Sequence, residues 1–159
     1  MTSKSEVAGC RTLPNAEIPG FESFVGSLRP GQIALGLFEA LPDVLFWIKD
    51  RKSRFIFVNR AFSDLIRLRP EEFIGRTDAD IFPAGIARSF LQDDQTVFES
   101  GMSILNKMEL VTHKAGGIEW RMTSKVPLFR NDGALVGTSG ISRRLDQREG
   151  HPLPAPYRA

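Results

Sequence analysis

The last third of the chain constrains the fold most, because strand-like segments there alternate with turns that are typical of β-hairpins. Residues 104–112, 118–128 and 135–142 have the composition and length of strands. The glycine-containing turns Ala115-Gly-Gly117 and Asn131-Asp-Gly133 separate these segments. Strands joined by consecutive hairpins run antiparallel. The sequence therefore predicts a three-stranded antiparallel unit in this region.

A further hairpin is expected earlier in the chain. The run from Val44 to Ile48 is continuously apolar, as in a strand that is covered on both faces. Residues 50–53 are polar and predict a turn, and Arg54-Phe-Ile-Phe-Val58 predicts a second strand that completes the hairpin. This pair would extend the sheet formed by the three later strands.

The segment between the two groups of strands is expected to be helical. Helices are predicted at 61–68 and 84–100, with one helical turn at 70–74 and a capped turn at 77–83. Gly101 ends the long helix. The predicted fold class is α+β, a five-stranded antiparallel sheet with its helices inserted between strands two and three.

The regions on either side of the predicted sheet differ in character. Residues 1–20 are expected to be a disordered leader, and residues 146–159 a flexible tail that contains proline. Residues 21–41 predict an N-terminal amphipathic helical cap, and residues 42–145 the folded domain. The apolar stripe of the cap must pack on the domain or on a second copy, so it is the predicted dimer interface. Its residues are Phe21, Phe24, Val25, Leu28, Ile33 and Leu37.

Charge and hydropathy argue against two classes of partner. The formal net charge is +2, which is too small to indicate binding to nucleic acid or to an anionic membrane surface. No segment approaches the roughly 20 apolar residues that span a bilayer, and residues 1–9 lack the apolar core of a secretory signal. The single cysteine, Cys10, cannot form an internal disulfide. A cytoplasmic location is therefore expected.

The sequence does not predict an enzyme. His113 and His151 are the only histidines, and neither lies near residues that would complete a nucleophilic constellation. There is also no glycine-rich phosphate loop and no spacing of metal ligands. We therefore expect a binding module.

Buried charge is predicted around Lys125. This residue alternates with Arg121 and Thr123 on one face of its strand, and Glu109 could oppose them across the hairpin. Asp94 falls within the apolar stripe of the long helix, where a carboxylate needs a partner. Two interpretations stay open. Asp94, Glu109 and Lys125 form an internal ion-pair network, or Lys125 or Arg121 binds the carboxylate or phosphate of a ligand.

The candidate residues fall into two sets. Those of a possible ligand pocket are Trp47, Phe57, Phe90, Asp94, Glu109, Val111, Arg121, Thr123, Lys125 and Ser142. Three others are expected to be structural: Asn59 as the cap of the helix that follows it, and Asp78 and Asp80 as caps of the turn at 77–83.

Several motifs occur in an order that resembles the PAS family over residues 38–145. They are Val58-Asn-Arg-Ala-Phe62, the turn 75–83, Asp94 with Val97 and Gly101, Glu109 with Trp120, Lys125, Pro127 and Leu128, and Gly133 with Gly137, Gly140 and Ile141. The match is similar to PAS modules of AraC-type transcription regulators and of sensor histidine kinases.

This resemblance implies the PAS fold and a sensory function. PAS modules bind small molecules between sheet and helices, and many dimerise through an N-terminal helix. The expected function is a signal-transduction module that binds a small molecule, forms a homodimer, or does both, to regulate an output domain in bacterial transcription. The alternatives are a ligand-free interaction domain and the input module of a sensor histidine kinase.

The resemblance also argues against two cofactors. PAS domains that bind haem use a histidine that is usually on the long helix, and residues 84–100 contain none. Flavin photosensors of the family need a cysteine in a Gly-x-x-Cys turn, which here reads Gly75-Arg-Thr-Asp78. The sequence leaves the ligand unnamed, with non-covalent flavin or a small organic acid both open.

Overall fold

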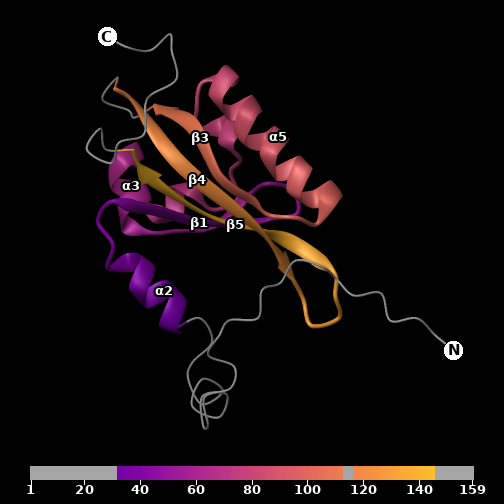
Figure 1. Ribbon diagram of the computed structural model, residues 1–159. Helices are drawn as coiled ribbons and strands as arrows, with labels where there is room; N and C mark the ends of the chain where they lie inside the picture. The colour runs from indigo at the N-terminus through magenta and orange to yellow at the C-terminus, as the bar shows by residue number, and fades with distance from the viewer. Residues whose placement is uncertain (1–31, 113–116, 146–159) are drawn as a thin grey trace, which may run out of the picture.

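The computed structural model describes residues 32–112 and 117–145 (Figure 1). The elements in chain order are α2 (Gln32–Glu39), β1 (Val44–Asp50), β2 (Phe55–Val58), α3 (Arg60–Ile66), α4 (Pro70–Phe73), the short 3-10 helix η1 (Asp78–Asp80), α5 (Ala84–Ser100), β3 (Ile104–Thr112), β4 (Ile118–Phe129) and β5 (Leu135–Arg144). No helix within the described ranges is long and apolar enough to cross a membrane.

The five strands form one antiparallel sheet in the order β2-β1-β5-β4-β3. The first hairpin and the last three strands meet where β1 pairs with β5 in the centre. All the helices from α3 to α5 lie in the chain between β2 and β3. The structure thus confirms the predicted α+β class and the position of the inserted helices.

The two faces of the sheet carry different layers. Leu45, Trp47 and Lys49 alternate along β1 and are buried toward the helical layer that includes α5. Phe46 points to the other side, where its ring stacks on Phe38 of α2 with the centroids 4.1 Å apart. Figure 1 shows α2 and α5 on opposite sides of the sheet. Strand β1 is therefore covered on both faces at this point, as its continuous apolar run predicts.

Asn59 connects three elements through its side chain. Its Oδ1 accepts from the backbone N of Phe62, which caps α3, and from the backbone N of Phe46 in β1. Its Nδ2 donates to the backbone carbonyls of Val44 and Phe38. The predicted cap is present, and it also attaches α2 to the sheet.

Two aspartates in the turn before α5, which the sequence predicts to be caps, have different roles in the structure. Asp80 accepts from the backbone N of Thr77 at 2.8 Å and from its hydroxyl at 2.9 Å, as a capping residue should. Asp78 is instead 2 % exposed and bonds to Lys49. The interpretation of Asp78 as a cap is wrong, because its carboxylate meets an ammonium inside the domain.

Two other expectations fall partly outside the described residues. Of the predicted cap at 21–41, the structure describes α2 and the residues after it, and Leu37 there is 62 % exposed. Phe21, Phe24, Val25 and Leu28 lie outside the described ranges, as do the leader 1–20 and the tail 146–159, whereas Ile33 lies in α2. Helix α3 ends earlier than predicted because Arg67 adopts a left-handed conformation with φ 57°.

Candidate ligand-binding cavity

A small cavity of about 30 Å³ lies between the inner face of the sheet and the helical layer. Its walls are aromatic on the helical side and largely polar where β3, β4 and β5 approach α5. The lining residues are Leu45, Trp47, Lys49, Phe55, Phe62, Asp78, Phe82, Phe90, Glu109, Val111, Thr123, Lys125 and Ser142. A cavity with convergent polar groups inside an apolar shell is typical of a small-molecule site.

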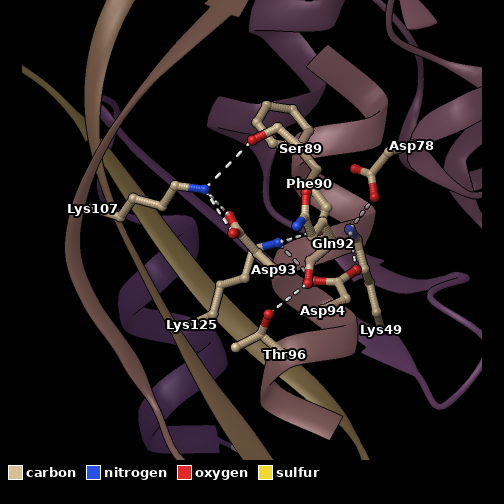
Figure 2. Close-up of polar contacts among 10 residues, drawn as sticks. All are labelled: Lys49, Asp78, Ser89, Phe90, Gln92, Asp93, Asp94, Thr96, Lys107 and Lys125. Atoms are coloured by element: carbon tan, nitrogen blue, oxygen red, sulfur yellow. Dashed lines mark hydrogen bonds and ion pairs between the residues drawn. The ribbon is translucent and has the colours of Figure 1, made fainter. Parts of the chain in front are cut away.

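Four charged side chains form a continuous series beside this cavity (Figure 2). Lys49 Nζ bonds to Asp78 and, at 3.0 Å, to Asp94 Oδ2. Lys125 Nζ lies 2.7 Å from Asp94 Oδ1 and 2.9 Å from the carbonyl oxygen of Phe90. We call this series, Asp78–Lys49–Asp94–Lys125, the buried charge chain. Its two ammonium groups balance its two carboxylates.

The pKa shifts of Lys49 and Asp94 in the buried charge chain favour the charged forms, whereas burial raises the pKa of Asp78 more than Lys49 lowers it. Burial acts to lower the pKa of Lys49, but Asp78 and Asp94 outweigh it, and the pKa is raised. Burial acts to raise the pKa of Asp94, but Lys49 and Lys125 outweigh it, and the pKa is lowered. Each of these two groups therefore remains ionised at neutral pH because of its partners.

A second polar group of residues lies farther along β4. Arg121 donates from Nε to Ser142 Oγ at 3.1 Å and from Nη2 to the carbonyls of Ser142 and Asp43, and it pairs with Glu119. The hydroxyls of Thr123 and Ser142 share a hydrogen bond at 2.9 Å. These bonds connect β4 and β5 to the residue preceding β1, so the Arg121 side chain is engaged in the scaffold.

Two polar atoms of the cavity wall have no hydrogen-bond partner among the described residues: Trp47 Nε1 and Glu109 Oε1. Both side chains are buried, at 6 % and 7 % exposure. Burial raises the pKa of the Glu109 carboxyl, more than Lys125 and a hydrogen bond from Thr123 lower it. We call Trp47 and Glu109 the open polar pair.

A further ion pair spans α5 and β3 beside the cavity. Lys107 Nζ lies 2.6 Å from Asp93 and 3.5 Å from the hydroxyl of Ser89 (Figure 2). Neither charged residue was singled out from the sequence. Asp93 and Asp94 are consecutive on α5 but bind different strands. Asp93 binds β3 through Lys107. Asp94 binds β1 through Lys49 and β4 through Lys125.

The structure brings together most of the residues predicted for a pocket. Those that line the cavity are Trp47, Phe90, Glu109, Val111, Thr123, Lys125 and Ser142. Asp94 is fully buried and bonds to Lys49 and Lys125 without lining the cavity. The predicted pair between Asp94 and Lys125 is present, but Glu109 does not join it through an ion pair with Lys125.

Two predicted pocket residues lie elsewhere. Phe57 pairs with Ile48 and contacts Phe46, with the ring centroids 5.8 Å apart, so it belongs to the face that carries α2. The register shifts between Ile48 and Lys49, and simple alternation does not reveal such an irregularity. Arg121 is buried on the helical face but lines a different hollow, near Asp43 and Arg144.

Lys49 and Asp78 line the cavity and form an ion pair, and neither is predicted as a pocket residue from the sequence. A signal for Lys49 existed, because it continues the alternation of Leu45 and Trp47 and so must share their buried face. The apolar run predicts that the strand ends at Ile48, whereas β1 continues for two more residues, to Asp50. For Asp78 there was no comparable local signal, since its partner lies 29 positions away.

Comparisons with known proteins agree with the fold described above. A family model described as the PAS fold matches residues 38–150. Structures of VqmA are similar: a Vibrio cholerae VqmA dimer has 32 % identity and a TM-score of 0.65, and covers 76 % of this chain and 53 % of its own. VqmA bound to DPO has 32 % identity and a TM-score of 0.62, covering 69 % and 56 %.

Curated relatives at lower identity are signalling enzymes. A Vibrio cholerae diguanylate cyclase is 26 % identical over 100 residues, which is 62 % of this chain and 31 % of the cyclase. The methanogenesis regulatory histidine kinase FilI of Methanothrix harundinacea is 29 % identical over 103 residues, 65 % of this chain and 11 % of the kinase. The chain thus spans a third or less of these relatives. Because the PAS-fold match extends over most of its length, the chain belongs to the PAS family of sensory modules.

Proposed function

We propose that this chain is the sensory module of a bacterial transcription regulator and that it binds a small molecule in the cavity between the sheet and α5. The observation that carries the proposal is the cavity itself, which has polar atoms that no described residue satisfies. VqmA supports it, because VqmA has been crystallised bound to DPO and in a complex with DNA, and it is 32 % identical to this chain.

The size of the cavity limits the ligand and requires some side chain to move. A cavity of about 150 Å³ accommodates benzene, whereas this one measures about 30 Å³. Phe82 also lines an adjoining surface groove of about 540 Å³, which includes Ile66 and Ile81. We therefore propose that Phe82 is the wall between the two spaces, and that its rotation admits a ligand of about one ring.

Strand β1 connects the cavity to α2 and could transmit the effect of ligand binding between them. Trp47 faces the cavity, and its neighbour Phe46 stacks on Phe38 of α2. The indole of Trp47 lies directly on Gly140 of β5, where an added Cβ would come within 2.3 Å of the ring. A ligand that displaces the indole must therefore also shift β1 against β5. Such a ligand would change the population of α2 packing states.

The dimer is part of the same proposal. Leu37 of α2 is exposed, and the related Vibrio cholerae VqmA is described as a dimer. Deleting residues 1–36 should convert a homodimer to a monomer in light scattering. An unchanged mass after the deletion would contradict the role of this segment in the interface.

The ligand proposal is tested by native mass spectrometry of the purified chain, with small molecules extracted and identified in parallel. We expect a bound mass that Val111→Phe, which fills the cavity, abolishes. The matched control is Ile56→Phe, at a position that is 54 % exposed, which should retain the bound mass. Absence of any bound mass, together with a higher melting temperature for Val111→Phe than for wild type, would indicate a ligand-free interaction domain.

The second candidate function is the input module of a sensor kinase or a diguanylate cyclase. The matches to FilI and to the Vibrio cholerae cyclase favour it, at 29 % and 26 % identity. The cavity would serve in the same way, and only the output would differ.

A further inference from the structure

We infer that the cavity selects an uncharged ligand of the amide class, one that accepts a hydrogen bond from Trp47 Nε1 and shares a hydrogen bond with the carboxyl group of Glu109. This inference rests on the proposed function, because it assumes that the cavity holds a small molecule. It assigns the open polar pair as the residues that determine specificity.

The first step is that the lysines of the cavity are already engaged. Lys49 bonds to two carboxylates, those of Asp78 and Asp94. Lys125 bonds to Asp94 and to the carbonyl oxygen of Phe90. Each ammonium keeps one N–H, but its charge is already balanced by these carboxylates. An anionic ligand would therefore add a buried negative charge with no cation to compensate it, which is strongly unfavourable. The carboxylate or phosphate ligand considered from the sequence is therefore disfavoured.

The second step is that two atoms in the same wall need partners. Buried polar groups in native proteins are almost always hydrogen-bonded, yet Trp47 Nε1 and Glu109 Oε1 are buried and unpartnered among the described residues. The indole N–H can only donate, so its partner must be an acceptor. Both side chains line one cavity, and a single small molecule there can reach both.

The third step concerns the charge of Glu109. The charged groups that act on it are Lys125 of β4, Lys107 of β3 and Asp93 of α5, and Thr123 of β4 donates a hydrogen bond to it. Lys107 and Asp93 pair with each other, and Lys125 pairs with Asp94. Burial therefore prevails and raises the pKa of the Glu109 carboxyl. In either form the carboxyl accepts from an amide N–H, and the protonated form, which the shift favours, can also donate to the amide carbonyl.

The test compares three single-ring probes of matched size on the full chain: benzamide, benzoate and benzylamine, by isothermal titration at pH 7. We expect saturable binding of benzamide, with benzoate and benzylamine at least about tenfold weaker, which is the effect of one unsatisfied buried polar contact. This comparison needs no variant, so it does not depend on a mutant folding.

Two variants assign the contacts. Trp47→Phe should weaken benzamide about fivefold, the effect of one hydrogen bond. Trp120→Phe, at the other tryptophan of the chain, should leave the affinity unchanged. Benzamide affinity in the wild type should fall as the pH is raised, whereas Glu109→Gln, which stays uncharged, should show no such fall. Glu71→Gln, on the exposed surface of α4, should keep the wild-type profile.

The outcomes separate the inference from the function on which it rests. Benzoate or benzylamine binding as tightly as benzamide would overturn the inference and leave the ligand-binding function in place. If Trp47→Phe binds benzamide as tightly as the wild type, the inference is also overturned, and the ligand-binding function again remains in place. If no probe binds and nothing co-purifies, both fail, and water occupies the position between Trp47 and Glu109.

Discussion

Two groups of buried polar residues lie in or beside the wall of the same cavity and differ in how completely their hydrogen-bonding atoms are satisfied. In the buried charge chain, every member has at least one oppositely charged partner, and Lys49 and Asp94 have two each. In the open polar pair, Trp47 Nε1 and Glu109 Oε1 have none among the described residues. The comparison teaches that burial of a polar side chain does not by itself indicate a binding residue. A satisfied group maintains the fold, and an unsatisfied one can recognise a ligand.

The largest expected effect comes from breaking the satisfied group. Lys49→Met leaves Asp78 without its ammonium and Asp94 with only one, and removing one member of a buried ion pair costs about 3–5 kcal/mol. Urea unfolding should show a loss of stability of this size. Lys52→Met, at an exposed position in the turn after β1, is the matched control and should change little. A loss below about 1 kcal/mol for Lys49→Met would contradict the structural role of the chain.

The next effect concerns the packing that supports the open polar pair. Gly140→Ala places a Cβ within 2.3 Å of the Trp47 ring, and overpacking of this kind costs about 1–3 kcal/mol. Denaturant unfolding should show this loss, and the fluorescence of Trp47 should change with it. Gly85→Ala in α5 has no atom near the added Cβ and should be neutral or slightly stabilising. Equal stability of the two variants would mean that Trp47 is free to move.

A smaller effect is expected from the pH dependence of Glu109. Its pKa is raised from the ordinary 4.5 by burial, so the folded state holds the proton more tightly than the unfolded state. The wild type should therefore lose stability as the pH rises from about 4.5 through the folded pKa. Glu109→Gln should lack this loss, so its stability relative to wild type should increase with pH in melting experiments from pH 4 to 8. A constant difference would mean that Glu109 titrates normally.

The smallest effect sharpens the contrast between buried and surface charges. Arg60 and Asp64 of α3 form an i,i+4 pair at 3.5 Å, with side chains 81 % and 71 % exposed. Solvent screens such a pair, and its contribution is about 0.3–0.5 kcal/mol. Asp64→Asn should therefore shift the urea midpoint only slightly. A loss comparable with that of Lys49→Met would show that exposure is a poor guide to ion-pair strength in this chain.

Much of the fold was predictable because its signals are local. The glycine at position 133 adopts φ +84° in the β4–β5 hairpin, and Gly101 adopts φ +66° at the end of α5. Both positions favour glycine for that reason. The apolar stripe of α5 also showed that Asp94 must be buried, and hence that it needs a cation. The alternation of Lys125 with Thr123 placed it on the same buried face, which left it open whether Lys125 pairs with Asp94 or binds a ligand.

The candidate site was predicted less completely, for a physical reason. Phe57 was assigned to the wrong face because a shift in register between Ile48 and Lys49 reverses simple alternation. Arg121 does lie on the inner face, but its guanidinium is held by Ser142, Glu119 and the carbonyl of Asp43, away from the cavity. The burial of Lys49 could be read from its alternation with Trp47, but its pairing could not, because its carboxylate partners are 29 and 45 positions away.

By itself the sequence determined the strands, the hairpins, the inserted helices and the burial of charge near Lys125. These features depend on periodicity and turn chemistry, which act over a few residues. Only the tertiary structure decided which buried charges neutralise one another and which polar atoms remain unsatisfied. That outcome depends on distances between β1, η1, α5 and β4, which the folded chain sets and no local pattern records.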